Sequence, residues 1–458
     1  MMHIKDFKNQ VIHFTGIGGV SMSGLALMLA KAGYQVTGSD QKESETLRQL
    51  RSIGIPCAVG HKPEFVEGSG LVVRTAAIAD SNPEIAMAHQ LGIPVMERGT
   101  LLGQLMQSYE EVICVSGAHG KTTASSMIAT ILELAGKHPT IHLGGTLPLI
   151  GSATQVGGKD FFVAEACEYK DSFLRFFPTL SVILNIDADH LDYFKDIEAI
   201  EASFTRFVQL TPASGLALGN ADDPRVLRVL SKAACPCETF GFEEGATWRA
   251  VSLSQNHGSY AFTLLHNGEV AAQVQLQVMG RHNVLNACAS MAVAYHAGVP
   301  LEEAAHILSG FTGAHRRFEK AGDYRSANVF HDYAHHPTEI KATLAAARQL
   351  ADRRLYCVFQ PHTYSRTKAL FQDFIESFDE VDRLVLLDIY AARETNPGDI
   401  SASMLADAIA QRGRTQVYYA ESFEKAAQLV RGWAEPGDTI LTLGAGDIEK
   451  MSRLLIEP

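Results

Sequence analysis

The chain has 458 residues, of which 46% are hydrophobic and 20% charged, a composition typical of a globular protein of several domains. Its net charge of −12 excludes a general nucleic-acid binder, because neutralising phosphates requires a basic surface. No uncharged apolar run reaches the length of a membrane span, the first ten residues lack the apolar core of a secretory signal, and the seven cysteines are dispersed, so we expect a cytoplasmic protein without membrane insertion.

The first hundred residues alternate between short apolar strands and helical segments. Because this order leaves successive strands running the same way, it predicts a parallel sheet covered by helices. Strands are expected at Val11–Thr15, Tyr34–Gly38, Leu71–Arg74 and Pro94–Met96, and a helix at Met22–Ala32.

A second α/β unit opens near Glu111. Its sheet is expected to be mixed, because two runs of period-two hydrophobicity flank Asn267-Gly268, a dipeptide favoured in hairpin turns. We expect a helix at Lys121–Ala135 and strands at Val112–Ser116, Phe161–Ala164, Ser181–Ile186, Tyr260–Leu265 and Val270–Val278.

A third α/β pattern starts near Phe318, with strands expected at Leu355–Phe359, Leu384–Ile389 and Thr439–Leu443. The changes of pattern place domain boundaries near residues 108 and 315. The predicted organisation is therefore three domains, at residues 1–107, 108–314 and 315–458.

The sharpest local signal is the run Gly117-Ala118-His119-Gly120-Lys121-Thr122-Thr123 between a buried strand and a helix. Glycines let backbone N–H groups turn toward a phosphate, and the N-terminus of the helix adds a favourable dipole. The lysine supplies a cation for the β- and γ-phosphates, and the hydroxyl that follows can ligate magnesium. Position 115 is valine, so the full P-loop spacing is not met, but the strand and the helix around the run favour a nucleotide phosphate site.

Two further polar groups follow strands of the same predicted sheet. Glu165 ends one strand, and His190 lies in the loop after the next one. Ligands of parallel sheets bind outside the carboxyl ends of the strands, so both side chains should share one rim with Lys121 and Thr122. Carboxylate and hydroxyl oxygens suit Mg²⁺ beside phosphate oxygens.

An N-terminal glycine turn, with Gly16, Gly18 and Gly19, resembles a dinucleotide fingerprint, and acidic Asp40 ends the second strand. Ser21 occupies the place of the third glycine, which weakens an NAD-binding interpretation. A diphosphate-binding turn with an acidic ribose or base partner and a merely structural turn both remain open.

Together these motifs resemble the Mur ligase family over essentially the whole chain. Besides the two glycine loops, the resemblance rests on Glu165-Ala166-Cys167-Glu168-Tyr169, Asn185-Ile186-Asp187-Ala188-Asp189-His190-Leu191-Asp192, Gly280-Arg281-His282-Asn283-Val284, Arg316-Arg317-Phe318-Glu319, Asp332-Tyr333-Ala334-His335-His336-Pro337-Thr338-Glu339, Phe359-Gln360-Pro361-His362 and Gly444-Ala445-Gly446-Asp447-Ile448.

The resemblance implies an α/β protein with a Rossmann-like N-terminal domain that binds a UDP-sugar, a central P-loop-type ATPase domain with a mixed sheet, and a Rossmann-like C-terminal domain. The implied reaction joins L-alanine to the lactyl carboxylate of UDP-N-acetylmuramate through an acyl phosphate, in peptidoglycan precursor synthesis, with ATP and Mg²⁺ required. It leaves homo-oligomerisation open.

The resemblance also implies roles for individual residues. The catalytic residues would be Lys121, Glu165 and His190, and the metal ligands Thr122, Glu165 and His190. ATP would contact Gly117, Ala118, His119, Gly120, Lys121, Thr122, Thr123, His282, Asn283, Arg316, Arg317 and Asp332. The UDP-sugar would contact Gly16, Gly18, Gly19 and Asp40, and the amino-acid pocket would contain His335, His362 and Arg366.

Some positions depart from the commonest form of the family. Cys167 and Lys170 stand where Asp is common, His331 where Asp is frequent, and Thr363 where Arg is frequent. Three other functions stay open: a sibling ligase that attaches a preformed peptide to the same UDP-sugar, an NAD-dependent oxidoreductase, and a non-enzymatic nucleotide-binding regulator. The second phosphate loop, with its lysine, argues against the oxidoreductase.

Overall fold

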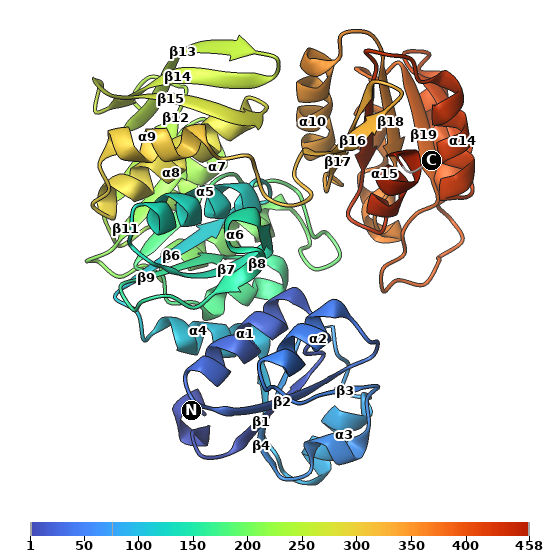
Figure 1. Ribbon diagram of the computed structural model, residues 1–458. Helices are drawn as coiled ribbons and strands as arrows, with labels where there is room; N and C mark the ends of the chain where they lie inside the picture. Colours follow the sequence, from blue (N-terminus) through green and yellow to red (C-terminus); the bar gives the residue numbers. More distant parts are fainter. Residues whose placement is uncertain (1, 76, 457–458) are drawn as a thin grey trace.

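The computed structural model describes residues 2–75 and 77–456, which form three lobes, each built on one sheet (Figure 1). In Figure 1 the N-terminal lobe (blue) lies below the central lobe (cyan to yellow), and the C-terminal lobe (orange to red) lies beside the central one. No helix among these described residues is long and apolar enough to span a membrane.

The N-terminal lobe has a parallel sheet of order β3-β2-β1-β4-β5. Its strands are β1 (Val11–Thr15), β2 (Gln35–Asp40), β3 (Cys57–Val59), β4 (Ser69–Arg74) and β5 (Val95–Glu97). Its helices are η1 (Ile4–Phe7), α1 (Val20–Lys31), α2 (Glu45–Ser52), η2 (Pro63–Val66), α3 (Pro83–Gln90) and α4 (Arg98–Met106), where η marks a 3₁₀ helix.

The central lobe has a mixed sheet of order β15-β14-β13-β12-β11-β10-β6-β9-β7-β8, parallel from β13 to β7 and antiparallel at both edges. Its strands are β6 (Glu111–Ser116), β7 (Thr140–Leu147), β8 (Ser152–Gln155), β9 (Phe161–Glu165), β10 (Leu180–Ile183), β11 (Leu216–Asn220), β12 (Cys237–Gly241), β13 (Trp248–Asn256), β14 (Ser259–His266) and β15 (Glu269–Met279). Its helices are α5 (Lys121–Leu134), η3 (Pro148–Ile150), η4 (Tyr169–Arg175), α6 (Ile197–Val208), α7 (Pro224–Leu230), α8 (His282–His296) and α9 (Leu301–Ser309).

The C-terminal lobe has a sheet of order β16-β17-β21-β18-β19-β20, in which only the β16–β17 pair is antiparallel among the described strands. Its strands are β16 (Glu319–Tyr324), β17 (Ala327–Asp332), β18 (Leu355–Phe359), β19 (Arg383–Leu387), β20 (Gln416–Ala420) and β21 (Thr439–Leu443). Its helices are α10 (Pro337–Leu350), α11 (Tyr364–Ala369), α12 (Phe371–Ile375), α13 (Ala402–Gln411), α14 (Phe423–Trp433) and α15 (Glu449–Ile456).

The N-terminal and central lobes share one hydrophobic core. A single cluster of buried side chains runs from Phe14 on β1 through Leu101 on α4 to Phe162 on β9 and Phe204 on α6. The C-terminal lobe packs around clusters of its own. Because apolar burial is the main source of cohesion, this division joins the first two lobes more firmly than the third, against whose core Leu191 and Met279 of the central lobe pack.

The structure confirms the three-part α/β architecture with its parallel and mixed sheets. The expected hairpin is present as β14 and β15, and Asn267 and Gly268 both have positive φ, at +51° and +86°, as a two-residue hairpin turn requires. We propose the domain limits at residues 107/108 and 314/315, because residues 107–110 and 310–318 link the sheets outside any helix or strand.

Candidate active site

The phosphate loop joins β6 to α5 and depends on two of its glycines. Gly117 and Gly120 have φ of +142° and +83°, a region that favours glycine. A Cβ at Gly120 would lie 2.9 Å from Oδ1 of Asn286, and one at Gly117 would lie 3.0 Å from Cβ of Leu184. No side chain caps α5, so the N–H groups of its first turn are available to a phosphate.

Asn185 holds the loop in place. Its backbone oxygen accepts a hydrogen bond from Ala118 N (3.2 Å), and its side-chain amide exchanges two hydrogen bonds with the backbone of His119, at 2.8 and 3.0 Å. This role explains why β10 ends at Ile183 and not at Ile186, where the expected strand end was wrong. The Leu184 N–H still donates to the Ser116 oxygen of β6, and beyond it Asn185 turns to bind the loop.

Lys121 and His190 are brought together by Glu168. The Lys121 ammonium lies 3.1 and 3.4 Å from the two carboxylate oxygens of Glu168, and His190 Nε2 lies 4.0 Å from Oε1 of the same group. Burial alone would lower the pKa of Lys121, but the neighbouring charges, chiefly the Glu168 carboxylate, together outweigh burial and raise this pKa above its ordinary value. Lys121 is therefore a permanent cation at the mouth of the loop.

Glu165 ends β9 with an unsatisfied carboxylate. Its Oε1 is buried and has no hydrogen-bond partner among the described residues. Two glycines of β7 make room beside it: a Cβ at Gly144 would lie 2.6 Å from Oε2 of Glu165, and one at Gly145 would lie 3.3 Å from Cγ2 of Thr122. Glu165 and Thr122 therefore both approach β7 at adjacent glycines, and a buried anionic oxygen without a donor is suited to a cation.

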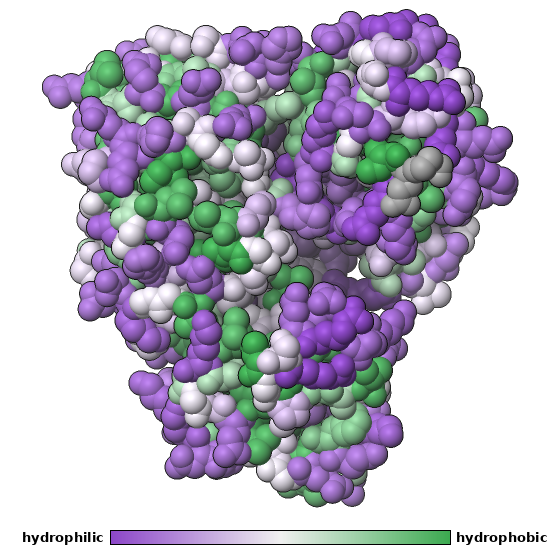
Figure 2. Space-filling view, in the orientation of Figure 1, coloured by the Kyte–Doolittle hydropathy of each residue, from purple (hydrophilic) through white to green (hydrophobic). Residues whose placement is uncertain are grey.

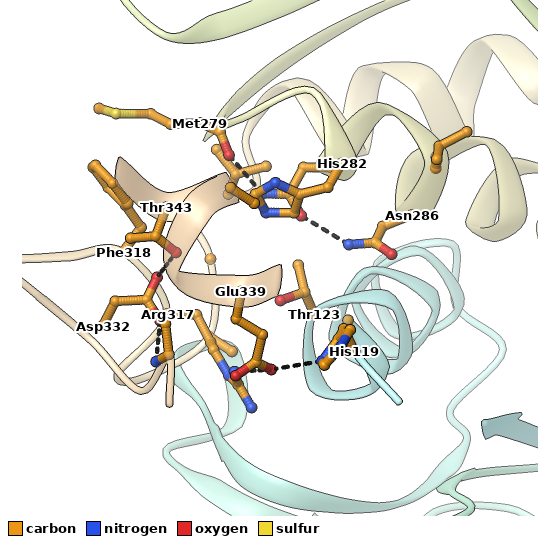
Figure 3. Close-up of a pocket in the computed structure, with 18 of the residues that line it drawn as sticks. His119, Thr123, Met279, His282, Asn286, Arg317, Phe318, Asp332, Glu339 and Thr343 are labelled. Atoms are coloured by element: carbon orange, nitrogen blue, oxygen red, sulfur yellow. Dashed lines mark hydrogen bonds and ion pairs between the residues drawn. The ribbon is translucent and has the colours of Figure 1, made fainter. Parts of the chain in front are cut away.

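A set of polar contacts links the phosphate loop to the C-terminal lobe. His119 Nε2 lies 2.9 Å from Oδ2 of Asp187, and its Nδ1 lies 3.3 Å from Oε1 of Glu339 on α10. Figure 3 shows His119 and Glu339 pointing toward one another across the pocket. Thr338 also donates to Asp187, at 2.7 Å, and His336 Nε2 lies 3.2 Å from the Ala188 oxygen. We call these five side chains (His119, Asp187, His336, Thr338 and Glu339) the interlobe clasp.

A cavity of about 870 Å³ lies between the loop, α8 and the C-terminal lobe, and its lining includes Thr123, Leu184, Met279, Phe318 and Phe330. Figure 2 shows the cleft between these two lobes, with hydrophilic residues along its edges. The volume and the partly apolar lining suit a nucleotide base with its sugar.

Polar side chains also line the cavity, among them His282, Asn286 and Asp332 (Figure 3). Asn283 donates to the Met279 oxygen (2.7 Å), and its Oδ1 accepts a hydrogen bond from Asn286 (2.8 Å). Burial lowers the pKa of His282 to about 4, so this imidazole is neutral at pH 7. On the opposite wall, burial raises the pKa of Asp332 to about 6, and its Oδ2 accepts from Thr343.

The two neighbouring arginines of the hinge point in different directions. Arg317 lines the cavity, and its Nη2 lies 3.4 Å from the Thr122 hydroxyl. Arg316 turns into the C-terminal lobe, where it donates to the Gly446 oxygen (2.8 Å) and to Nε2 of His331 (3.2 Å). Burial lowers the pKa of His331 to about 4, so its neutral ring acts as an acceptor that positions Arg316.

The residues expected in the amino-acid pocket gather around Asp189 of the central lobe. Arg366 donates to Oδ1 of Asp189 at 2.7 and 3.2 Å, and its Nη1 lies 3.1 Å from Nδ1 of His362. The His335 and His362 rings are 5.7 Å apart. Because Asp189 precedes His190, this group lies directly beside the Lys121 side of the site.

The glycine turn of the N-terminal lobe closes on Asp40. The Gly18 N–H donates to Oδ2 of Asp40 at 2.9 Å, and a Cβ at Gly18 would lie 2.9 Å from the same oxygen. Gly16 has φ of +82°, and its oxygen accepts from Gly19 N. Gly16, Gly18, Gly19 and Asp40 are thus contiguous at the N-terminus of α1, which carries no side-chain cap.

Three family models match successive parts of the chain. The Mur ligase family catalytic domain matches residues 11–110, the Mur ligase middle domain matches residues 115–294, and the Mur ligase glutamate ligase domain matches residues 316–446. The chain belongs to the Mur ligase family.

Relatives of this Mur ligase cover nearly its full length. It is 46% identical over 448 residues to UDP-N-acetylmuramate–L-alanine ligase of Acetivibrio thermocellus, covering 97% of this chain and 95% of that protein. It is 44% identical over 457 residues to the protein of the same name from Caldanaerobacter subterraneus subsp. tengcongensis, covering 100% and 99%.

Solved structures give the same picture. The crystal structure of UDP-N-acetylmuramate-alanine ligase from Thermotoga maritima superposes with a TM-score of 0.82 at 29% identity, and 98% of each chain is covered. A murein peptide ligase from Psychrobacter arcticus superposes with a TM-score of 0.72 at 27% identity, again with 98% of each chain covered. The predicted family is therefore confirmed.

Sequence reasoning did not assign several residues of this Mur ligase site. No role was predicted for Asn185, Glu168, Asn286 or Glu339, although all of these except Asn286 lie in motifs that carry the family resemblance. Asn185 and Glu168 contact loop residues 66 and 47 positions away, and Glu339 reaches His119 from another lobe. Asn286, one helical turn after Asn283, offered the one local signal, since the two side chains share a helix face.

Proposed function

We propose that this chain is an ATP-dependent ligase that forms an amide bond between L-alanine and the lactyl carboxylate of UDP-N-acetylmuramate, a step of peptidoglycan precursor synthesis. The contact that carries the proposal is the ion pair of Arg366 with Asp189, at 2.7 Å. It joins the C-terminal lobe, which carries the residues expected in the amino-acid pocket, to the loop that bears His190, beside the ATP site. The relatives that share 44–46% identity over nearly the whole chain bear the name of this ligase.

In the first half of the proposed reaction, a carboxylate oxygen attacks the γ-phosphorus of ATP. The bond from that phosphorus to the bridging oxygen breaks, and ADP leaves behind an acyl phosphate. Charge accumulates on the phosphate oxygens, and Lys121 and the uncapped first turn of α5 are placed to stabilise it. Catalysis of this step rests on placing the reacting groups and neutralising the phosphate charge, and no protein nucleophile takes part.

In the second half, the amine of L-alanine attacks the acyl carbon, the C–O bond to phosphate breaks, and the proton lost by the nitrogen passes to the departing phosphate. Burial lowers the pKa of His335 to about 3 and that of His362 to about 4, so both rings are neutral hydrogen-bond partners at pH 7. His335 Nδ1 lies 3.0 Å from the Tyr333 oxygen and so carries the ring proton, which leaves Nε2 as an acceptor for the alanine amine.

We propose Mg²⁺ as the cofactor, held by Thr122 and Glu165 and, at a second position, by His190. The buried, unpartnered Oε1 of Glu165 fits this assignment, because an anionic oxygen without a donor attracts a hard cation. The ion would offset the charge of the β- and γ-phosphates. Closure of the C-terminal lobe through the interlobe clasp would keep water from the acyl phosphate.

The proposal is tested by ADP release with ATP, Mg²⁺ and UDP-N-acetylmuramate, with and without single L-amino acids. We expect ADP release to need both the UDP-sugar and L-alanine. A preformed peptide replacing L-alanine in this assay would assign the chain to the sibling branch represented by the peptide ligase of Psychrobacter arcticus. We also propose a cytoplasmic location, since the reaction consumes ATP and all seven cysteines are free thiols.

A further inference from the structure

Arg98 is a cation without a counter-ion at the seam between the N-terminal and central lobes. It opens α4, which lies beside α1 where these lobes meet (Figure 1). Among the described residues, no carboxylate oxygen lies within 4 Å of its guanidinium, and its one hydrogen bond goes to Ser21, from Nη1 at 2.8 Å. The adjacent carboxylate of Glu97 is already bound by Arg74 at 2.9 Å. Most N–H donors of Arg98 are therefore unused.

The Ser21 contact fixes where the guanidinium lies. Ser21 is in the first turn of α1, next to the glycine turn, and its hydroxyl also lies 2.7 Å from Nε2 of His142 on β7. Nδ1 of His142 lies 3.0 Å from the Thr154 hydroxyl. Burial, with the nearby charge of Arg98, lowers the pKa of His142 to about 3, so the ring is neutral and does not offset or add to that charge. The chain of contacts explains the serine in place of a third glycine.

A second cation adds to the positive field. The side chain of Arg175 crosses Gly99, where a Cβ would lie 3.4 Å from its Cδ. No carboxylate oxygen lies within 4 Å of Arg175 in the described parts of the chain either. The first turn of α1 contains no acidic residue and carries no side-chain cap, so its N–H groups add partial positive charge. Arg175 is exposed, whereas Arg98 is half-buried, and a half-buried cation is costly unless an anion accompanies it.

The boundary between the N-terminal and central lobes extends toward the ATP site. Helix α4, which Arg98 opens, packs against η4, and Glu168, the residue just before η4, holds Lys121 at 3.1 Å. Arg98 therefore stands between the glycine turn and the lysine of the phosphate loop. An anionic substrate that spans the two lobes would pass this guanidinium.

We propose that Arg98 binds the diphosphate of the sugar nucleotide, with Ser21 as the residue that positions it. This inference rests on the proposed function, and it adds a specific charged contact to the glycine turn. A planar guanidinium is suited to the task because it can donate two parallel hydrogen bonds to phosphate oxygens. Its contact to Ser21 through a single nitrogen leaves that geometry available.

The test is calorimetric binding of UDP and of UDP-N-acetylmuramate to the full-length protein and to Arg98→Met and Arg98→Lys. Arg98→Met should weaken both ligands by a similar factor, about ten- to a hundredfold for loss of a charge-assisted contact. Arg98→Lys keeps the charge and loses the planar fork of the guanidinium. It should weaken the binding of both ligands several-fold. Arg51→Met is the matched control, because Arg51 is an exposed arginine of the same lobe that is paired with Glu43.

The outcomes separate the possible roles. ADP affinity unchanged in the Arg98 variants would show that the fold is intact. Unchanged UDP affinity in both Arg98 variants overturns the inference, and so does weakening confined to UDP-N-acetylmuramate, since that would place Arg98 on the lactyl carboxylate. If the unmodified protein bound neither sugar nucleotide, the proposed function would fail first, and the inference with it.

Discussion

The imidazole of His119 and the carboxylate of Glu339 meet across the boundary of the central and C-terminal lobes, with 3.3 Å between Nδ1 and Oε1. Burial lowers the pKa of His119, but the Asp187 and Glu339 carboxylates together outweigh burial and raise it to about 9. The ring is thus a cation at pH 7, held between carboxylates of two lobes. Docking of the C-terminal lobe is thereby coupled to the phosphate loop itself.

Glu339→Gln should weaken this docking, because it replaces a charged acceptor with a neutral one. An ion pair whose two side chains are each 13% exposed should contribute about 1–3 kcal/mol, between the values for exposed and buried pairs, so the KM for ATP should rise about five- to a hundredfold where closure limits binding. Steady-state kinetics with varied ATP measures this. An unchanged KM for ATP would show that the interlobe clasp does not contribute to ATP binding.

The difference in stability between the unmodified protein and Glu339→Gln should depend on pH. The folded pKa of His119 is raised from 6.5 to about 9, so its stabilising contribution is full below pH 6.5, declines above that, and is lost as pH rises through 9. The difference in Tm between the unmodified protein and Glu339→Gln should therefore shrink between pH 7 and pH 9. Gln349→Ala, which breaks an uncharged interlobe hydrogen bond to Gln255, should give a difference independent of pH.

Lys121→Ala should abolish most ligase activity and also destabilise the fold. From the sequence alone the lysine belongs to an exposed loop, and its loss should cost little packing. In the structure it is buried against Glu168, whose side chain is only 2% exposed. Leaving such a carboxylate unpaired costs about 3–5 kcal/mol. Urea unfolding should show this loss, and Lys121→Ala with Glu168→Gln should recover stability without activity. A single variant as stable as the unmodified protein would contradict the buried pair.

The Lys121–Glu168 pair illustrates what the sequence could and could not predict. The phosphate loop was predictable because its glycines, lysine and flanking elements are local in the chain, and so was the hairpin at Asn267-Gly268. Burial of Lys121 was not, since its partner lies 47 residues away and reaches it only through the order of the sheet. Likewise, nothing in the helical pattern around Glu339 indicates that this carboxylate faces His119 in another lobe.

Glu165→Ala and His190→Ala should each raise the Mg²⁺ concentration needed for half-maximal activity by about tenfold or more, as expected when a contact of a metal site is lost. Glu165→Ala should leave stability unchanged, because Oε1 has no partner to lose among the described residues. Titrations of Mg²⁺ at saturating ATP measure the shift, and Glu133→Ala, on the far end of α5, is the control. Superimposable titrations for both site variants would refute the metal assignment.

Activity should be indifferent to carbon dioxide. Some Mur ligases carry a carbamoylated lysine after the Asp-His motif, and the corresponding stretch here, residues 202–207 on α6, contains none. In this stretch Ser203 and Arg206 instead bind Asp171, and the contact between Arg206 and Asp171 is 2.9 Å long. Rates in degassed buffer with and without bicarbonate should agree, and rescue by bicarbonate would show that another lysine is carbamoylated.

L-alanine should be the preferred amino acid, with L-serine and glycine used measurably. One methyl group in an apolar pocket is worth only about 1–3 kcal/mol, or roughly ten- to two-hundredfold, and such a pocket cannot strongly reject an added hydroxyl. Bulky or D-configured amino acids should fail by a wider margin, because they clash or misplace the attacking amine.

The structure gives a further reason why bulky or D-configured amino acids should be poor substrates. Arg366 is fixed by Asp189 and by His362, which together limit the positions open to the alanine carboxylate and amine. Arg366→Lys should therefore raise the KM for L-alanine far more than the KM for ATP, since a lysine cannot make the same paired contacts. A panel of single amino acids at saturating ATP and UDP-N-acetylmuramate compares the catalytic efficiencies. If D-glutamate or a tripeptide outperformed L-alanine, the substrate assignment would be wrong, while the fold and the ATP site would stand.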